Sequence, residues 1–183
     1  MKRISAAALV LFASLFVSPA TWSAEPDETP PRTCGPLPEP PIRGKAWAVD
    51  GGALSFVASS GRRLYVRLWG IETPPLRDAT TRIERVPGVQ ARFALDERLR
   101  QAGRDVSCSP VAWDQACRLV ATCEAAGNDL GIRLLVEGYA LLRTHQAVGK
   151  DALDLGRHYA ESEERARDRR NGLWLNWLGP KMP

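Results

Sequence analysis

The segment from Gly44 to Gly70 most constrains the fold, because apolar and polar residues alternate along it and glycine-containing turns interrupt it. Alternation with a period of two is typical of strands with one buried face. Gly51-Gly52 and Ser59-Ser60-Gly61 are residue types that favour hairpin turns. The pattern therefore predicts three consecutive strands, at about Lys45–Val49, Ala53–Ala58 and Arg62–Trp69.

Later segments add helices and two more strands. Residues 87–103 have helical spacing, and a short helix is expected between a cap at Asn128 or Asp129 and a stop at Gly138. The other predicted elements are strands near Asp105–Pro110 and Arg118–Glu124 and a last helix at about Asp151–Arg170. Five short strands with a helix after the third predict an α+β fold, a five-stranded OB-type β-barrel with three helices.

The last predicted helix is rich in charges of both signs. Glu161 and Arg165, and likewise Glu163 and Arg167, are spaced i,i+4 in the order that favours ion pairs. This spacing favours a solvated helix face with ion pairs over a surface that binds nucleic acid.

The N-terminal residues have the pattern of an export signal. Two basic residues precede an apolar run from about Ala6 to Val17, and small residues follow. The run is shorter than the ~20 residues of a membrane span, so no stable span is expected, although an uncleaved anchor is an open alternative. We predict a signal peptide at 1–24, a proline-rich lead-in at 25–43 and one folded domain at 44–178, in an exported protein that is periplasmic or extracellular.

The net charge of the chain says little about what the protein binds. Loss of the leader takes the net charge from +4 to +2, because the leader holds Lys2 and Arg3. Such a mild excess permits an anionic partner but does not by itself argue for one.

Four cysteines in an exported chain indicate two disulfides. Three pairings are possible. Cys108 and Cys123 fall on consecutive strands at similar distances from the connecting turn, which favours their pairing and leaves Cys34 with Cys117. That second bridge would hold the proline-rich lead-in beside Arg118. Metal binding by the cysteines is the weaker interpretation, because the chain has no C-x-x-C motif.

Five sequence motifs occur in an order that resembles the staphylococcal nuclease (thermonuclease) family. They are VDGGAL, RLWGIETPP, WDQACRLVATC, GNDLGIRLLVEGYA and ESEERARDRRNGLW, and they extend over about Gly44 to Trp174. The resemblance implies a barrel that binds nucleic acid (DNA or RNA) and cleaves phosphodiesters with calcium. In such a site carboxylates hold the ion, a glutamate activates water and two arginines bind the phosphate.

Position by position, the resemblance assigns roles to four residues of this chain. Arg67 and Arg118 match the two phosphate-binding, catalytic arginines of the family. Asp50 matches the first aspartate of its D-G-D-T motif, and Glu72 replaces its second metal-binding aspartate. Asp50 and Glu72 are therefore the candidate metal ligands.

Two departures from the family pattern weaken the implied chemistry. Gly52 stands where a metal-binding aspartate is expected, and Pro75 stands where the glutamate is expected. Calcium takes six to eight oxygen ligands, so a calcium site should be weak or absent here. Loss of a general base typically costs ~10²–10⁴-fold in rate. Asp78 and Glu84 lie in the following loop and could supply a substitute carboxylate, although we expect that they do not.

These observations leave three functional hypotheses. The first is a divergent family member that binds nucleic acid or another phosphate-bearing ligand, with hydrolysis lost or much weakened. The second is a metal-dependent nuclease that is still active. The third is a non-catalytic interaction module of the cell envelope. The fold alone does not choose among them, and whether the protein is an enzyme is left open.

Overall fold

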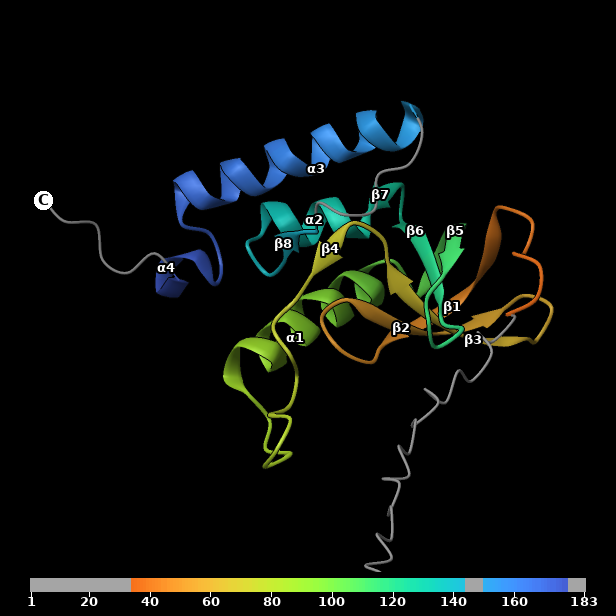
Figure 1. The fold of residues 1–183 in the computed structure, drawn as a ribbon, viewed down its shortest axis with the longest axis horizontal. Helices are drawn as coiled ribbons and strands as arrows, with labels where there is room; N and C mark the ends of the chain where they lie inside the picture. The colour runs from red at the N-terminus through yellow and green to blue at the C-terminus, as the bar shows by residue number, and fades with distance from the viewer. Residues whose placement is uncertain (1–33, 144–149, 178–183) are drawn as a thin grey trace, which may run out of the picture. The chain divides into compact units, whose positions relative to one another are not determined.

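The computed structural model describes residues 34–143 and 150–177. A β-barrel forms one side of the domain, and the helices extend from it on the other side (Figure 1). Its strands are β1 (Ile42–Ala48), β2 (Ala53–Ala58), β3 (Arg63–Leu68), β5 (Asp105–Trp113) and β6 (Leu119–Ala125). They are hydrogen-bonded in the order β3-β2-β1-β5-β6, and a parallel pairing of β3 with β6 closes the barrel. The predicted α+β fold with a five-stranded barrel is confirmed.

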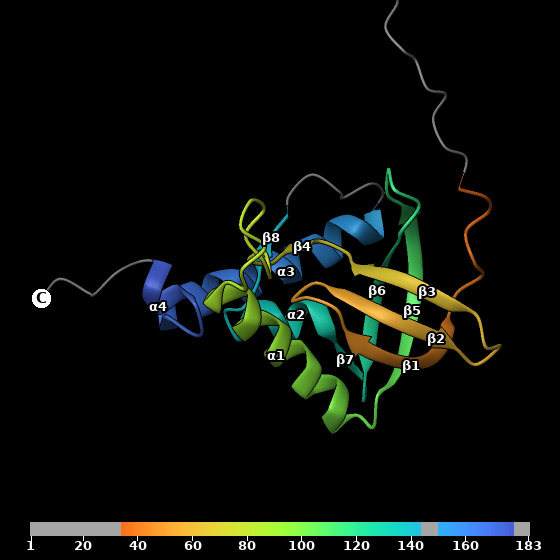
Figure 2. The same ribbon diagram turned by 90° about the horizontal axis from the view of Figure 1, so that it is seen from below.

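Short strands and helices complete the domain. The short strands are β4 (Ile71–Glu72), β7 (Asn128–Asp129) and β8 (Leu141–Leu142), and the helices are α1 (Val86–Gln101), α2 (Leu130–Val136), α3 (Lys150–Arg169) and α4 (Trp174–Trp177). The three predicted helices are α1, α2 and α3, and α4 is a single additional turn. In two perpendicular views α2 lies between α1 and α3 (Figures 1 and 2). None of the described helices is long and apolar enough to span a bilayer.

Two strand boundaries differ from the prediction. β1 begins at Ile42, so the end of the predicted 25–43 lead-in belongs to the barrel. β5 continues to Trp113 instead of ending at Pro110, because a bulge that leaves Val111 unpaired directly follows the proline and lets the ladder resume at Ala112. The extension carries β5 to the loop that precedes Arg118. The predicted signal peptide at 1–24 lies outside the described residues.

The core joins the inner face of the barrel to α1 and α2. Fully buried side chains include Leu54, Phe56, Val66, Leu95, Leu99, Leu119, Leu134 and Leu135. Tyr159 of α3 joins this core, where its ring meets Trp69 edge-on at a centroid distance of 5.4 Å.

The hydroxyl of Tyr159 also links α3 to the start of α2. It donates to Asp129 over 2.8 Å, and Asp129 in turn accepts from the Ile132 amide as the N-cap of α2. Burial raises the pKa of both Tyr159 and Asp129.

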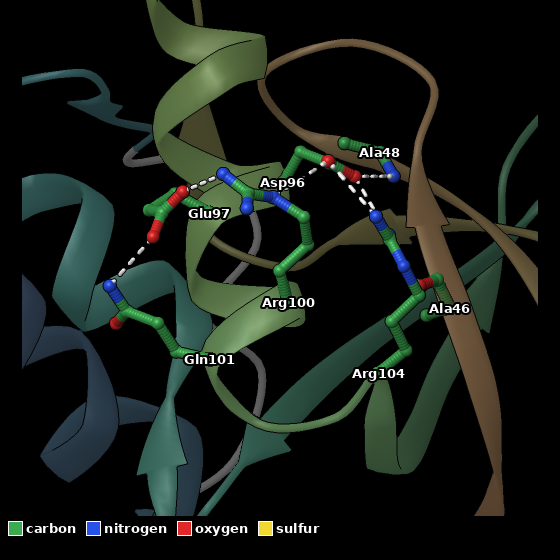
Figure 3. Close-up of polar contacts among 7 residues, drawn as sticks. All are labelled: Ala46, Ala48, Asp96, Glu97, Arg100, Gln101 and Arg104. Atoms are coloured by element: carbon green, nitrogen blue, oxygen red, sulfur yellow. Dashed lines mark hydrogen bonds and ion pairs between the residues drawn. The ribbon is translucent and has the colours of Figure 1, made fainter.

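A polar contact fixes the C-terminal half of α1 to the barrel (Figure 3). The Asp96 carboxylate accepts from the Arg104 guanidinium at 2.8 and 3.1 Å and from the Ala48 amide at 3.5 Å. The hydrogen bond from Arg104 lowers the pKa of Asp96. Arg100 lies 3.8 Å from the same Asp96 carboxylate, and it connects that contact to Glu97 and Gln101 on the exposed side of the helix. The Asp96 contact therefore holds the end of β1 against α1, just before the β1–β2 turn.

The charged helix α3 does not form the predicted ion pairs. Neither Glu161–Arg165 nor Glu163–Arg167 is an ion pair among the described residues. Glu163 instead accepts from the Leu142 amide of β8 at 2.9 Å, and the Arg167 guanidinium lies 5.9 Å from the centre of the Trp174 ring. The partners of Glu163 and Arg167 thus lie outside α3, whereas Arg165 donates to Ser162 at 3.1 Å within the helix.

Two disulfides form as expected. Cys108 and Cys123 face each other in the β5–β6 register and are bonded. The second bridge joins Cys34 to Cys117 and attaches the lead-in to the loop before Arg118. The favoured pairing is therefore confirmed.

The buried bridge should contribute strongly to stability. We expect the double substitution Cys108→Ala/Cys123→Ala to lower the free energy of unfolding by about 3 kcal/mol, because the bridge restricts a short loop of the unfolded chain between residues separated by 15 positions. Urea denaturation measures the change, with Ser109→Ala on the exposed face of β5 as the control. A loss below about 1 kcal/mol would contradict this expectation.

Candidate functional site

Two of the predicted site residues meet because the barrel closes in parallel. Arg67 lies near the end of β3 and Arg118 directly precedes β6, and the two strands pair with Val66 opposite Leu119. Both guanidinium groups approach the carboxylate of Asp114. One of its oxygens lies 2.6 Å from Arg118 Nε and 3.8 Å from Arg67 Nη1. The structure thus brings Arg67 and Arg118 together around one acid.

Asp114 is held as an anion by its own loop. Its other oxygen accepts from the backbone amides of Ala116 and Arg118, each at 2.9 Å. Burial alone would raise the pKa of Asp114, but the hydrogen bonds from the Arg118 backbone and guanidinium outweigh it and lower that pKa. Sequence reasoning missed this residue. The sequence clue was the spacing, because Asp114 precedes Arg118 by four positions.

The ring of Tyr65 packs against the guanidinium of Arg118. The Arg118 guanidinium carbon lies 5.7 Å from the centre of the Tyr65 ring, within the range of a cation–π contact. Burial, followed by the negative charge of Asp50, raises the pKa of Tyr65, so its phenol stays neutral at ordinary pH. The orientation of Arg118 is therefore fixed by an acid on one side and an aromatic ring on the other.

Two cavities share a wall that contains the arginines. The larger, of about 490 Å³, is bounded by the loop from Trp113 to Ala116. The smaller, of about 230 Å³, is bounded by the β1–β2 turn and by residues 72–76. Four residues line both cavities: Arg67, Ile71, Arg118 and Arg143. A ligand in either cavity would meet the same guanidinium groups.

The smaller cavity gathers the remaining positions singled out in the sequence. Asp50, Glu72, Gly52 and Pro75 all line it. One oxygen of Asp50 accepts from the Gly52 amide at 2.8 Å, and Glu72 is exposed. The positions singled out in the sequence therefore lie around one cavity, and the metal-binding role of Asp50 and Glu72 stays a prediction.

The cavity lining does not suit calcium. It offers two carboxylates, one of them already bound to a backbone amide, and three arginines face the same space. Calcium takes six to eight oxygen ligands and favours several charged ones. Within residues 34–143 and 150–177, no group of three or more His, Cys, Asp or Glu side chains is placed to hold a metal ion.

The two acidic residues of the following loop have structural partners. Asp78 accepts from the backbone amides of Thr80 and Thr81, and Glu84 lies 3.7 Å from Arg77 in an ion pair. These contacts stabilise a hairpin, and neither acid lines the smaller cavity. They do not supply the carboxylate that is missing at Pro75.

Helix α1 packs tightly against the segment that carries Pro75. A Cβ atom at Gly88 would come within 2.3 Å of the Pro75 carbonyl oxygen and 2.6 Å of the Leu76 Cα atom. Only glycine permits this approach. The backbone at Pro75 is thus held by its neighbours, at the edge of the smaller cavity.

The lead-in contacts the loop from Trp113 to Cys117, which precedes Arg118. Beyond the Cys34–Cys117 bridge, the Trp113 indole donates to the Gly35 carbonyl at 3.0 Å. Cys117 itself has a φ of 56°, in the left-handed region that residues other than glycine rarely adopt. The bridge and the Cys117–Asp114 backbone hydrogen bond of 2.9 Å hold this unfavourable conformation in place.

Arg143 is a third cavity arginine that sequence reasoning did not find. It directly follows β8, and its backbone amide donates to the Gly70 carbonyl at 2.8 Å. The pairing of β8 with β4 places it beside the wall formed by Arg67 and Arg118. Arg143 lies three residues beyond the motif GNDLGIRLLVEGYA and belongs to none of the five motifs, so its position follows from the β8–β4 pairing.

Comparison with protein families agrees with this geometry. The family model described as "Staphylococcal nuclease homologue" matches residues 65–176, which is more than half of the chain. The chain therefore belongs to the staphylococcal nuclease family. No curated protein matches the chain. The matched region contains Arg67, Glu72, Pro75 and Arg118, whereas Asp50 and Gly52 precede it.

Asp114 should make stability depend on pH. Its folded pKa lies below the ordinary value of 3.8, so its contribution is present above that pH and is lost as the pH falls through the folded pKa. We expect Asp114→Asn to lower the free energy of unfolding at about pH 6, and the difference from the wild type to shrink at acidic pH.

Urea denaturation across this pH range measures the effect of Asp114→Asn. Asp168→Asn, an exposed substitution on α3, is the matched control. A difference between wild type and Asp114→Asn that stays constant as the pH falls would contradict the assignment of Asp114 as a stabilising anion.

Proposed function

We propose that this domain binds the phosphate backbone of nucleic acid, or another phosphate-bearing ligand, with hydrolysis lost or much weakened. The observation that carries the proposal is the composition of the smaller cavity. Arg67 and Arg118 line it, while Gly52 and Pro75 occupy the positions where the family resemblance places carboxylates. The site retains groups that bind phosphate and lacks groups that activate water.

The arginines have donors available for a phosphate. Arg118 gives its Nε to Asp114, which leaves its two terminal nitrogens for a ligand. Arg67 lies 3.8 Å from the same acid, at the limit of an ion pair. Guanidinium groups bind phosphate oxygens through paired hydrogen bonds, and partial burial strengthens each of them. Asp114 thus orients Arg118 without consuming its capacity to bind an anion.

Hydrolysis needs a group that removes a proton from water. Pro75 carries no such group, and the acids of the neighbouring hairpin are engaged elsewhere. Glu72 is the remaining exposed carboxylate of the smaller cavity, and it favours the alternative of an active metal-dependent nuclease. We place the protein in an oxidising compartment, periplasmic or extracellular, because both disulfides would be unstable in a reducing cytosol.

Restoring the missing carboxylates tests the loss of hydrolysis. A Cβ atom at Gly52 would lie 3.4 Å from Thr73 Oγ1, an ordinary contact, and Pro75 is exposed, so Gly52→Asp/Pro75→Glu should fold. We expect this variant to cleave single-stranded DNA with calcium on the order of 10²-fold faster than the wild type. The same variant with Arg118→Ala is the control and should be inactive.

Binding of the wild type to DNA and RNA, measured with and without chelator, completes the test. Chelator-sensitive cleavage by the wild type, absent in Arg118→Ala, would establish an active nuclease and contradict the proposal. Absence of any salt-dependent binding would leave the third hypothesis, a protein interaction module of the cell envelope.

A further inference from the structure

Arg143 differs from the other two cavity arginines in its charge environment. Arg118 donates to Asp114 at 2.6 Å, and Arg67 lies 3.8 Å from the same carboxylate. In the described part of the chain, the Arg143 guanidinium has no ion-pair or hydrogen-bond partner. Its positive charge is therefore the least compensated of the three that line both cavities.

The backbone around Arg143 is well anchored. β8 pairs with β4, with Leu142 opposite Ile71, and the Arg143 amide donates to Gly70. From the other side, Glu163 of α3 accepts from the Leu142 amide. These backbone contacts fix the point from which the Arg143 side chain enters the cavity wall, and its guanidinium is left available to a ligand.

The acidic neighbours do not neutralise this cation. Asp50 is hydrogen-bonded to the Gly52 amide, and Glu72 is exposed on β4 and forms no ion pair with a described residue. The smaller cavity thus combines three arginines with two carboxylates, and the larger cavity combines the same arginines with Asp114 alone. Both cavities carry a net positive lining, which favours an anion over a metal cation.

We propose that Arg143 is a third phosphate-binding residue, and that with Arg67 and Arg118 it binds a nucleic-acid phosphate without a metal ion. This inference rests on the proposed function. Its physical basis is that a guanidinium group provides both charge and directed hydrogen bonds, so it can hold phosphate oxygens in a site whose carboxylates are too few for calcium. The fitting ligand is a single strand, whose unpaired nucleotides can enter the cavities of about 490 and 230 Å³ that share the arginine wall.

Salt dependence separates a phosphate contact from a structural role. The probe is a fluorescent single-stranded oligothymidylate in the presence of chelator, with its affinity measured at several salt concentrations. Each phosphate contact on a single strand adds about −0.7 to the slope of log affinity against log salt. We expect Arg143→Ala to make the slope less steep by about 0.7 and to weaken binding roughly 10-fold at low salt.

Two further variants sharpen the result. Arg143→Lys should retain the slope but bind more weakly than the wild type, because an ammonium group carries the charge without the paired donors. Arg62→Ala, on the exposed β2–β3 turn, is the matched control and should change neither slope nor affinity. A thermal unfolding curve checks that Arg143→Ala is folded. If it shows no cooperative transition, Arg143→Gln takes its place with the same expected slope.

The outcomes distinguish this inference from the proposed function. If Arg118→Ala loses affinity while Arg143→Ala behaves like Arg62→Ala, phosphate binding stands and the role of Arg143 is overturned. If the wild type does not bind, or if Arg118→Ala binds as well as the wild type, the proposed function fails, and this inference fails with it. A slope that is less steep in Arg143→Ala, with affinity partly restored in Arg143→Lys, supports the inference.

Discussion

The parallel pairing of β3 with β6 is the contact on which the site depends. It closes the barrel, and because Arg67 lies in β3 and Arg118 directly precedes β6, it also brings their guanidinium groups to one place. Asp114 then holds both, from a loop that the Cys34–Cys117 bridge secures. The closure that buries the core is thus the same structural feature that brings the two arginines together.

The charge balance of the cavity separates binding from catalysis. Arginines stabilise a phosphate whether or not it reacts, but hydrolysis also requires a group that activates water. Here the binding groups are ordered by Asp114 and Tyr65, while Gly52 and Pro75 present no carboxylate. Arg143 adds a third positive charge to the lining of the smaller cavity. Our proposal is therefore that the family fold is kept with a site that binds a phosphate and cleaves it weakly or not at all.

Much of this arrangement could be predicted from the sequence. The Ala53–Ala58 strand and the Cys108–Cys123 pairing followed from strand alternation and turn spacing, which are local patterns. The motif order identified the family and located Arg67 and Arg118. Arg143 could not be predicted in the same way, because its place depends on a two-residue strand that pairs with a distant partner. The α3 ion pairs were predicted wrongly for a related reason, since Glu163 bonds to β8 instead.

The most direct test of the account is to observe the arginine side chains themselves. Nuclear magnetic resonance of the guanidinium Nε–H groups, recorded while a thymidine dinucleotide is added in the presence of chelator, reports which arginines bind the phosphate. The account predicts that the resonances of Arg67, Arg118 and Arg143 shift together and that the resonance of Arg62 does not. Shifts confined to other arginines, or binding that appears only when calcium is added, would contradict it.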